Sequence, residues 1–247
     1  MTVARPTLPP DTYCAAAPGH PWHGPYHDTE YEEQILPLAA DLLEGSTRVL
    51  DIGTGEGQIA RLAIARGVSS VVGVDPTEAQ VVEAAQRDGG PAYARAGAAL
   101  LPFRRDAFDS VIACLVFEHI EAVDSAIAEV ARVLRPGGRF LFFLNHPLLQ
   151  TPGSGWIDDQ VLDPPEQYWR IGPYLVEDHS IEEVEKGVFI PFIHRPLSRY
   201  VNALADNGLY LRQMLEPAPP PGFLARAVEY GAAASIPRLL VLVTEKA

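Results

Sequence analysis

The chain has 247 residues and a formal net charge of -13 at pH 7, with 47% hydrophobic and 21% charged residues. This is the composition of an ordinary globular protein, and the acidic balance disfavours nucleic acid as a partner, because nucleic-acid binders need basic surface. Cys14 and Cys114 are too far apart to indicate a disulfide framework or a metal site, and no apolar run reaches the ~18 residues of a membrane span. We therefore expect a soluble, cytoplasmic protein without membrane contact.

Residues 1–28 are rich in proline and predict an N-terminal arm rather than a helix. Residues 29–247 have the pattern of one domain. Thr29 and Glu32 show the spacing of a capping box and predict a helix at the start of this domain. Pro37 is placed to kink or divide that helix.

Strands and helices then alternate along the chain. Apolar runs between turn residues predict strands at 48–53, 69–75, 92–95, 108–115 and 139–145, and two late strands at 209–215 and 238–245. Helical spacing of apolar residues predicts helices at 58–66, 77–87, 127–134 and 197–207. Such alternation implies an α/β fold with a mostly parallel sheet and helices on both faces.

Residues 147–195 interrupt this alternation with prolines, glycines and two of the three tryptophans. The aromatic side chains of the segment are Trp156, Tyr168, Trp169, Tyr174 and Phe189. Such composition argues against a long regular element and also against a disordered linker. One interpretation is an ordered lid over an acceptor pocket, since ligand sites are mostly apolar. The alternatives are packing of the insertion onto the core and a contact in a homodimer.

The segment VLDIGTGEGQIA, residues 49–60, places a G-x-G-x-G turn between a predicted strand and a predicted helix. Such turns lie where open parallel sheets bind ligands. The dinucleotide fingerprint G-x-G-x-x-G is displaced here, because position 58 is glutamine. Asp51 and Glu56 beside the turn would repel a pyrophosphate by about 1 to 4 kcal/mol at ~4 Å and would suit a cationic ligand. S-adenosylmethionine, with a sulfonium, an ammonium and no phosphate, is such a ligand.

Asp75 closes the second predicted strand. A carboxylate at this place can accept both ribose hydroxyls, as in NAD sites, so Asp75 alone leaves the two cofactors open. The structural alternative is that Asp51 and Asp75 only cap loops. Their joint position around the glycine turn favours a cofactor site.

Four segments occur in the order VLDIGTGEGQIA, VVGVDPTEAQ, LPFRRDAFDSVIACLVFEHI and VARVLRPGGRFLFF. They resemble the successive motifs of class I S-adenosylmethionine-dependent methyltransferases, and more narrowly the small-molecule, type 11-like subfamily, over about residues 48–145. The resemblance implies a Rossmann-like, doubly wound, mostly parallel seven-stranded sheet with an antiparallel final strand and an irregular insertion after strand five. It also implies methyl transfer from S-adenosylmethionine to a small-molecule acceptor by in-line displacement.

The resemblance implies a cofactor site made of Tyr26, Asp51, Gly53, Thr54, Gly55, Gly57, Asp75, Pro76, Gly97, Ala98, Cys114, Leu115 and His119. In this site Asp51 lies near the sulfonium and ammonium, and Asp75 takes the ribose. The family usually has an aspartate for the adenine amino group four residues before LPF, where this chain has Gly97. The backbone of Gly97 and Ala98 is expected to replace it. Tyr26 is expected to reach the methionine carboxylate, with aromatic packing of the arm as the alternative.

Candidate catalytic residues follow from position and chemistry. His146 ends the fifth predicted strand, and histidine can act as a base near neutral pH. The alternative is that His146 bonds a backbone group. His194 is a second candidate facing the acceptor from the lid, with packing as its alternative. No metal site is expected from Glu118 and His119 or from the arm histidines.

Three other functions are alternatives to methyl transfer. The first is a non-catalytic module that binds S-adenosylmethionine or its product, which the departure at Gly97 favours slightly. The second, an NAD(P)-dependent oxidoreductase, is disfavoured by the displaced glycine. The third, aminopropyl transfer, needs a dense acidic site for a polyamine, which the sequence does not show.

Overall fold

The computed structural model describes residues 29–87, 89–185 and 188–247. The expected N-terminal arm, with Tyr26, lies outside the described residues. Within them, no helix combines the length and the apolar character needed to cross a bilayer.

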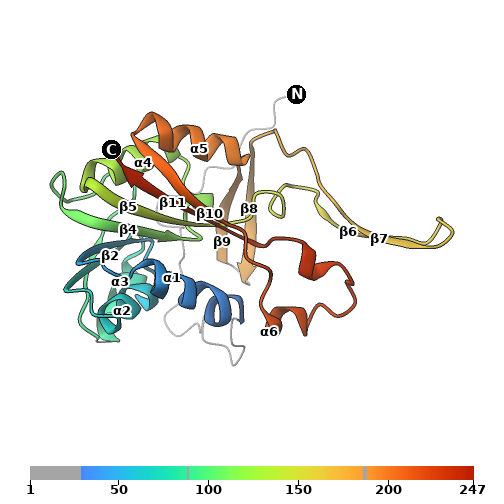
Figure 1. Ribbon diagram of the computed structural model, residues 1–247, viewed down its shortest axis with the longest axis horizontal. Helices are drawn as coiled ribbons and strands as arrows, with labels where there is room; N and C mark the ends of the chain where they lie inside the picture. Colours follow the sequence, from blue (N-terminus) through green and yellow to red (C-terminus); the bar gives the residue numbers. More distant parts are fainter. Residues whose placement is uncertain (1–28, 88, 186–187) are drawn as a thin grey trace.

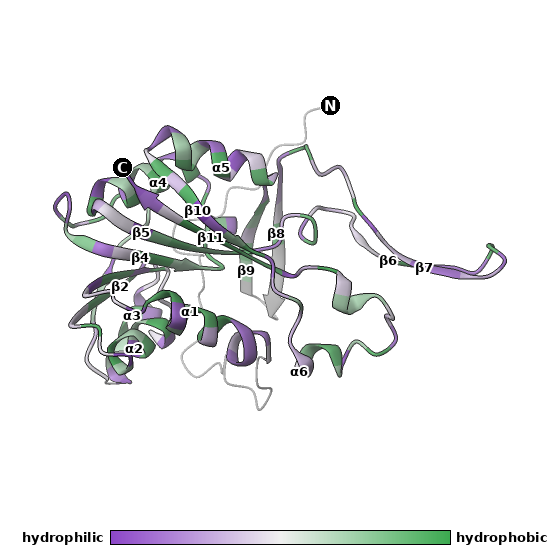
Figure 2. Cartoon of the chain, in the orientation of Figure 1, coloured by the Kyte–Doolittle hydropathy of each residue, from purple (hydrophilic) through white to green (hydrophobic). Residues whose placement is uncertain are grey.

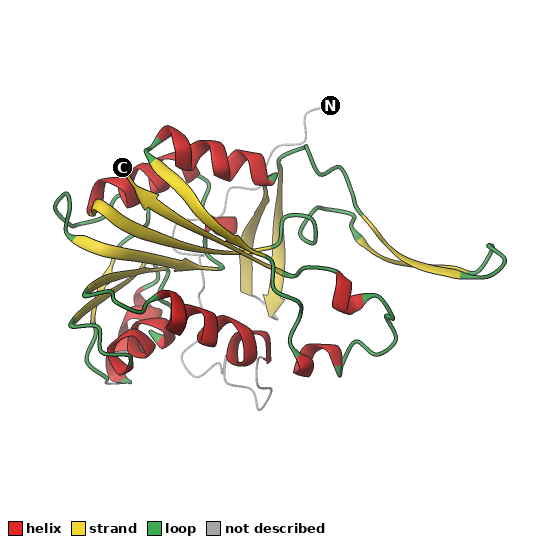
Figure 3. Ribbon diagram, in the orientation of Figure 1, coloured by secondary structure: helices red, strands yellow, loops and turns green. Residues whose placement is uncertain are grey.

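A seven-stranded sheet forms the centre of the molecule (Figures 1 and 3), in the order β10-β11-β5-β4-β1-β2-β3. The strands are β1 (Arg48–Ile52), β2 (Ser70–Asp75), β3 (Ala92–Arg95), β4 (Phe108–Cys114), β5 (Leu134–Asn145), β10 (Leu209–Leu215) and β11 (Leu239–Lys246). β11 pairs antiparallel with β5 and β10, while the pairs among β1 to β5 are parallel. The predicted fold is confirmed, and the strand order reverses between β1 and β4, which makes this the switch point.

Helices cover both faces of the sheet (Figure 1). The first group comprises α1 (Leu36–Leu42), α2 (Gln58–Ala65) and α3 (Glu78–Gln86), and the second comprises α4 (Val123–Val133) and α5 (Leu197–Asp206). The strands between them are largely hydrophobic (Figure 2), because a parallel sheet is buried on both sides. One core cluster joins the sheet to α4 and α5, and another joins it to α1 and α2.

The first helix differs from the sequence prediction at its start. A π-helix, η2 (Tyr31–Ile35), runs directly into α1, and Pro37 occupies the first turn of α1. Proline is tolerated there because it fits the first turn of a helix. The Thr29 hydroxyl accepts a hydrogen bond from Arg226 at 2.8 Å.

The segment after β5 was expected to be irregular, and it instead folds into two antiparallel hairpins. The first pairs β6 (Gly155–Asp159) with β7 (Glu166–Arg170), and the second pairs β8 (Asp178–Glu185) with β9 (Val188–His194). Figure 1 shows β6 and β7 projecting away from the body, while β8 and β9 stand beside the end of the central sheet. The remaining short elements are α6 (Pro221–Leu224), η3 (Phe117–His119) and η4 (Ala233–Ser235).

Candidate functional site

The loop after β1 is held against the neighbouring strand by its own backbone. The amides of Gly53 and Thr54 both donate to the carbonyl of Val74, at 2.8 and 2.9 Å, and the amide of Gly57 donates to the carbonyl of Thr54 at 2.8 Å. Gly53, Gly55 and Gly57 all have left-handed φ angles, of 68°, 52° and 78°. Only glycine adopts this conformation without steric cost, which explains the alternate glycines.

The three glycines have different surroundings. A Cβ on Gly53 would lie 2.3 Å from a methyl group of Val116, and one on Gly57 would lie 2.2 Å from the Tyr93 hydroxyl. A Cβ on Gly55 would meet no described atom within 4 Å. The outer two glycines therefore allow close packing, and Gly55 lines the open side of the loop.

Asp51, at the end of β1, is a buried carboxyl group with 2% exposure. Its Oδ2 accepts a hydrogen bond from the Thr54 hydroxyl at 2.6 Å. Burial raises the pKa of Asp51 from its ordinary 3.8 to about 7, against hydrogen bonds from Thr54 and the Ala60 backbone and with a further rise from the charge of Asp75. Ionised Asp51 is therefore costly in the free protein, and a nearby cation would relieve that cost.

Asp75, at the end of β2, connects the glycine loop to the start of α3. Its Oδ2 accepts from the Gly55 amide at 3.1 Å, and its Oδ1 accepts from the Thr77 amide at 2.9 Å. Burial raises its pKa. The Thr77 side chain also hydrogen-bonds this carboxylate. A carboxylate accepts about four hydrogen bonds, so with three protein donors it still has room for a ribose hydroxyl.

Glu56 does not have the role that its place in the loop suggested. It forms an ion pair with Arg87 at 2.9 Å, so its charge is balanced within the protein. The two carboxylates that the fold brings together around the loop are Asp51 and Asp75. The sequence argument for a cationic ligand therefore depends on this pair.

The end of β3 continues the carboxyl edge of the sheet beside β2. The Ala96 amide donates to the Asp75 carbonyl at 3.0 Å, which sets the following turn beside β2. Gly97 is exposed, a Cβ on it would meet no described atom within 4 Å, and Ala98 is buried. Pro76 is also exposed on this side. The backbone around Gly97 is thus open where the family aspartate would stand.

The end of β4 lies beside the glycine loop on its other side. Cys114 and Leu115 are half-buried, and Leu115 has a left-handed φ of 54°. The Leu115 amide donates to the Phe143 carbonyl at 3.0 Å, which holds this unusual conformation. Val116 then contacts Gly53. Such strain in a non-glycine residue is characteristic of functional sites.

Glu118 is a buried carboxylate to which the sequence alone gives no role. Its Oε1 accepts from the backbone and side-chain amides of Asn145, at 2.6 and 3.2 Å, so it joins η3 to the end of β5. Burial raises its pKa, while the charge of His119 and the Asn145 bonds lower it. Its Oε2 is enclosed and has no partner among the described residues. An acidic residue directly after an apolar strand was the available signal in the sequence.

Three histidines near this edge use their ring nitrogens differently. In His146, Nε2 donates to Glu216 at 2.8 Å and Nδ1 accepts from the Leu148 amide at 3.2 Å. Both ring nitrogens are therefore already used within the protein and are not available to a molecule that accepts the methyl group. In His194, Nε2 donates to the Tyr174 carbonyl at 2.8 Å, and the ring is 1% exposed. His119 is half-buried, and its Nδ1 donates to the Pro191 carbonyl at 2.7 Å.

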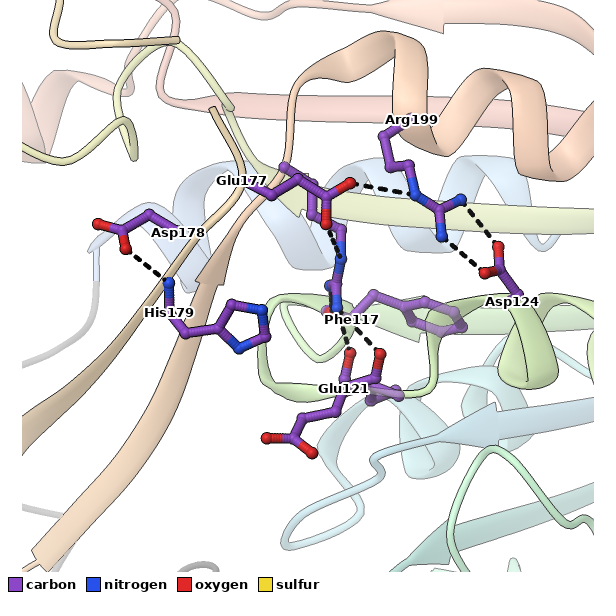
Figure 4. Close-up of polar contacts among 9 residues, drawn as sticks. Phe117, Glu121, Asp124, Glu177, Asp178, His179 and Arg199 are labelled. Atoms are coloured by element: carbon purple, nitrogen blue, oxygen red, sulfur yellow. Dashed lines mark hydrogen bonds and ion pairs between the residues drawn. The ribbon is translucent and has the colours of Figure 1, made fainter. Parts of the chain in front are cut away.

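A buried arginine fastens the β8–β9 hairpin to the turn after β4. Arg195 donates to the carbonyls of Phe117, Ile120 and Glu121 at 3.1, 2.7 and 3.2 Å. Nearby, Arg199 pairs with Asp124 at 2.6 Å and with Glu177 at 3.2 Å (Figure 4). These contacts place the hairpin beside η3.

Aromatic side chains of the insertion do not form one cluster at this edge. Trp156 stacks on Tyr230 at 4.9 Å and meets Trp169 edge-on at 5.6 Å. Tyr168 and Phe189 are exposed. This arrangement packs β6 and β7 against the segment before β11. No cluster of three metal-binding side chains occurs among the described residues.

A doubly wound sheet with a left-handed glycine loop and two buried carboxylates at its switch point defines a Rossmann-like class of nucleoside-binding folds. Residues 50–142 match the family model Methyltransf_11, a methyltransferase domain. A crystal structure of an S-adenosylmethionine-dependent methyltransferase from Mesorhizobium loti is 27% identical, with a TM-score of 0.71 over 85% of this chain and 96% of that one. Residues 50–142 therefore match a methyltransferase domain of the type 11 kind, as the four motifs predicted, and the chain is similar over most of its length to a solved S-adenosylmethionine-dependent methyltransferase.

Two curated relatives are similar over part of their length. The uncharacterized methyltransferase YcgJ of Bacillus subtilis is 41% identical over 45% of this chain and 46% of its own length. The ubiquinone biosynthesis O-methyltransferase of Rhizobium rhizogenes is 39% identical over 41% of this chain and 42% of its own length. The chain thus spans less than half the length of these curated relatives.

Proposed function

We propose that the protein binds S-adenosylmethionine at the carboxyl edge of its sheet and transfers the methyl group to a small-molecule acceptor. The observation that carries this proposal is the pair of buried carboxylates, Asp51 and Asp75, around the loop 53–57 at the switch point. The methyltransferase domain over residues 50–142 includes both of them.

The charge of the site supports a cationic donor over a phosphate-bearing one. Two buried carboxylates disfavour a nearby pyrophosphate and favour a sulfonium and an ammonium. Asp51 would face the positive groups, and Asp75 would accept a hydrogen bond from the ribose with its remaining lone pair. Gly55, without a Cβ, would let the loop backbone approach the methionine part.

Methyl transfer from a sulfonium requires the protein mainly to align donor and acceptor and to exclude water, because the leaving group is already activated. The side chain of Val116, just before η3, packs on the donor loop, and the β8–β9 hairpin lies beside η3, so the turn and the hairpin would form the acceptor side. The hydrogen bonds from Arg195 hold the hairpin to the turn after β4, which favours an ordered cover over the acceptor side. The net charge of -13 favours a small molecule over a nucleic acid as acceptor.

Mass spectrometry of the native purified protein tests the donor, and a transfer assay tests the reaction. We expect retained S-adenosylmethionine or S-adenosylhomocysteine, and labelled product when methyl-labelled donor is mixed with the small-molecule fraction of a bacterial extract. Retained donor without product from any acceptor fraction would favour the non-catalytic binding module. Retained NAD would overturn the proposal.

A further inference from the structure

His119 differs from the other histidines of the carboxyl edge in the state of its ring. The Pro191 carbonyl can only accept, so the hydrogen of the neutral ring is on Nδ1 and the lone pair is on Nε2. Nε2 has no hydrogen-bond partner in 29–87, 89–185 or 188–247. In His146 both nitrogens are engaged, and in His194 the unpartnered Nδ1 is enclosed.

The position of His119 relates it to the donor loop. Its amide donates to the Val116 carbonyl at 2.9 Å, and the side chain of Val116 contacts Gly53. The ring is therefore carried by a short turn that packs directly on the glycine loop. From the other side, the Phe192 ring of β9 meets the imidazole edge-on at 5.9 Å.

The charged group that faces His119 from its own turn is Glu118, whose pKa the histidine charge lowers. From β9, His119 meets an uncharged carbonyl and a phenyl ring. Arg195 directs its guanidinium to the backbone carbonyls of the same turn. A histidine with one nitrogen held by a carbonyl and the other available has the arrangement of a general base.

We propose that His119 is the catalytic base of the transfer and that the acceptor is a molecule whose nucleophilic oxygen or nitrogen carries a hydrogen. This assignment rests on the proposed function. The acceptor lone pair forms the new bond to the methyl carbon, and the carbon–sulfur bond breaks with its electrons going to sulfur. The acceptor proton moves to Nε2 of His119. The imidazolium keeps its Nδ1–H bond to Pro191 and later releases the proton to water.

Two variants separate the role of the basic Nε2 from that of the hydrogen bond between Nδ1 and the Pro191 carbonyl. His119→Asn keeps an amide donor for the Pro191 carbonyl and removes the basic nitrogen, whereas His119→Ala removes both. Calorimetry should show a much smaller loss in S-adenosylmethionine affinity than in transfer rate for the Asn variant. Single-turnover transfer from methyl-labelled donor to the small-molecule extract fraction should fall by at least ~100-fold in both variants.

A second readout needs no turnover. Diethyl pyrocarbonate modifies accessible, unprotonated imidazole nitrogens, and peptide mapping gives the rate at each histidine. We expect His119 to react at least ~10-fold faster than His146 and His194, and to be protected by S-adenosylmethionine. If His119 is as unreactive as His194, or if folded His119→Asn forms product at the wild-type rate, the assignment is overturned. A wild-type protein that does not bind S-adenosylmethionine would instead overturn the proposed function.

Discussion

Replacing Asp51 by asparagine should make the protein more stable at alkaline pH relative to wild type, and poorer at binding its donor. The pKa of Asp51 is about 7 in the folded chain against an ordinary 3.8. A difference of about 3 pH units corresponds to about 4 kcal/mol, at ~1.4 kcal/mol per unit. Because the pKa of Asp51 is raised in the folded chain, the protonated carboxyl group contributes this free energy to folding stability below pH ~3.8. The contribution is lost as the pH rises towards ~7.

The change with pH isolates this effect from other consequences of the substitution. Asparagine keeps an acceptor for Thr54, but its amide cannot accept the Ala60 bond, which costs about 1 to 3 kcal/mol at every pH. From pH 5 to pH 8, the free energy of unfolding of wild type should fall by about 2 to 3 kcal/mol relative to Asp51→Asn.

Urea denaturation of the free protein at several pH values measures this difference. Asp41→Asn, at an exposed aspartate of α1, controls for the loss of one negative charge. A difference between wild type and Asp51→Asn that stays flat from pH 5 to pH 8 would refute the reasoning about burial. The same variant should bind S-adenosylmethionine at least ~10-fold more weakly, with a smaller loss for S-adenosylhomocysteine, which lacks the sulfonium.

Three further predictions concern the ribose, the loop and the insertion. Asp75→Ala should weaken S-adenosylmethionine binding by about 1.5 to 3 kcal/mol, the scale of hydrogen bonds to a charged group, and unchanged affinity in calorimetry of the folded variant would remove the ribose assignment. Gly53→Ala should lower the melting temperature more than Gly45→Ala, because both have left-handed φ angles (68° and 77°) but only Gly53 would clash, with Val116; equal losses would contradict this. Trp156→Ala should increase proteolysis within β6 and β7, since it removes the stack on Tyr230, and leave donor affinity unchanged; a large loss of donor affinity would place the hairpin in the cofactor site instead.

The central sheet and the donor loop could be predicted because their signals are local. Apolar runs bounded by glycine and proline mark buried parallel strands, and the glycines of 53–57 mark a backbone that needs positive φ. Asp51 and Asp75 follow directly from strand ends, so their meeting at one edge follows from topology.

The partners of polar side chains could not be read in the same way, because they come from distant parts of the chain. Glu56 is paired with Arg87, and His146 with Glu216, 70 residues further on. Neither contact leaves a pattern in the local sequence, yet each decides whether the group is available to a ligand.

The two hairpins were missed for a different reason. β6 and β7 are short and have no buried residue, so they lack the apolar run of a buried strand. Pro191 lies within β9, and proline inside a run argues against a strand in the middle of a sheet. It is tolerated in β9 because the two-stranded ribbon has only one pairing edge for each strand.

The central claim is that the carboxyl edge of this sheet selects a cationic nucleoside donor over a phosphate-bearing dinucleotide. Calorimetric titration of one ligand-free preparation with S-adenosylmethionine, S-adenosylhomocysteine and NAD tests it most directly. We expect saturable 1:1 binding of the first two and at least ~100-fold weaker binding of NAD. Binding of NAD as tight as that of S-adenosylmethionine, or no binding of either sulfur ligand, would contradict it.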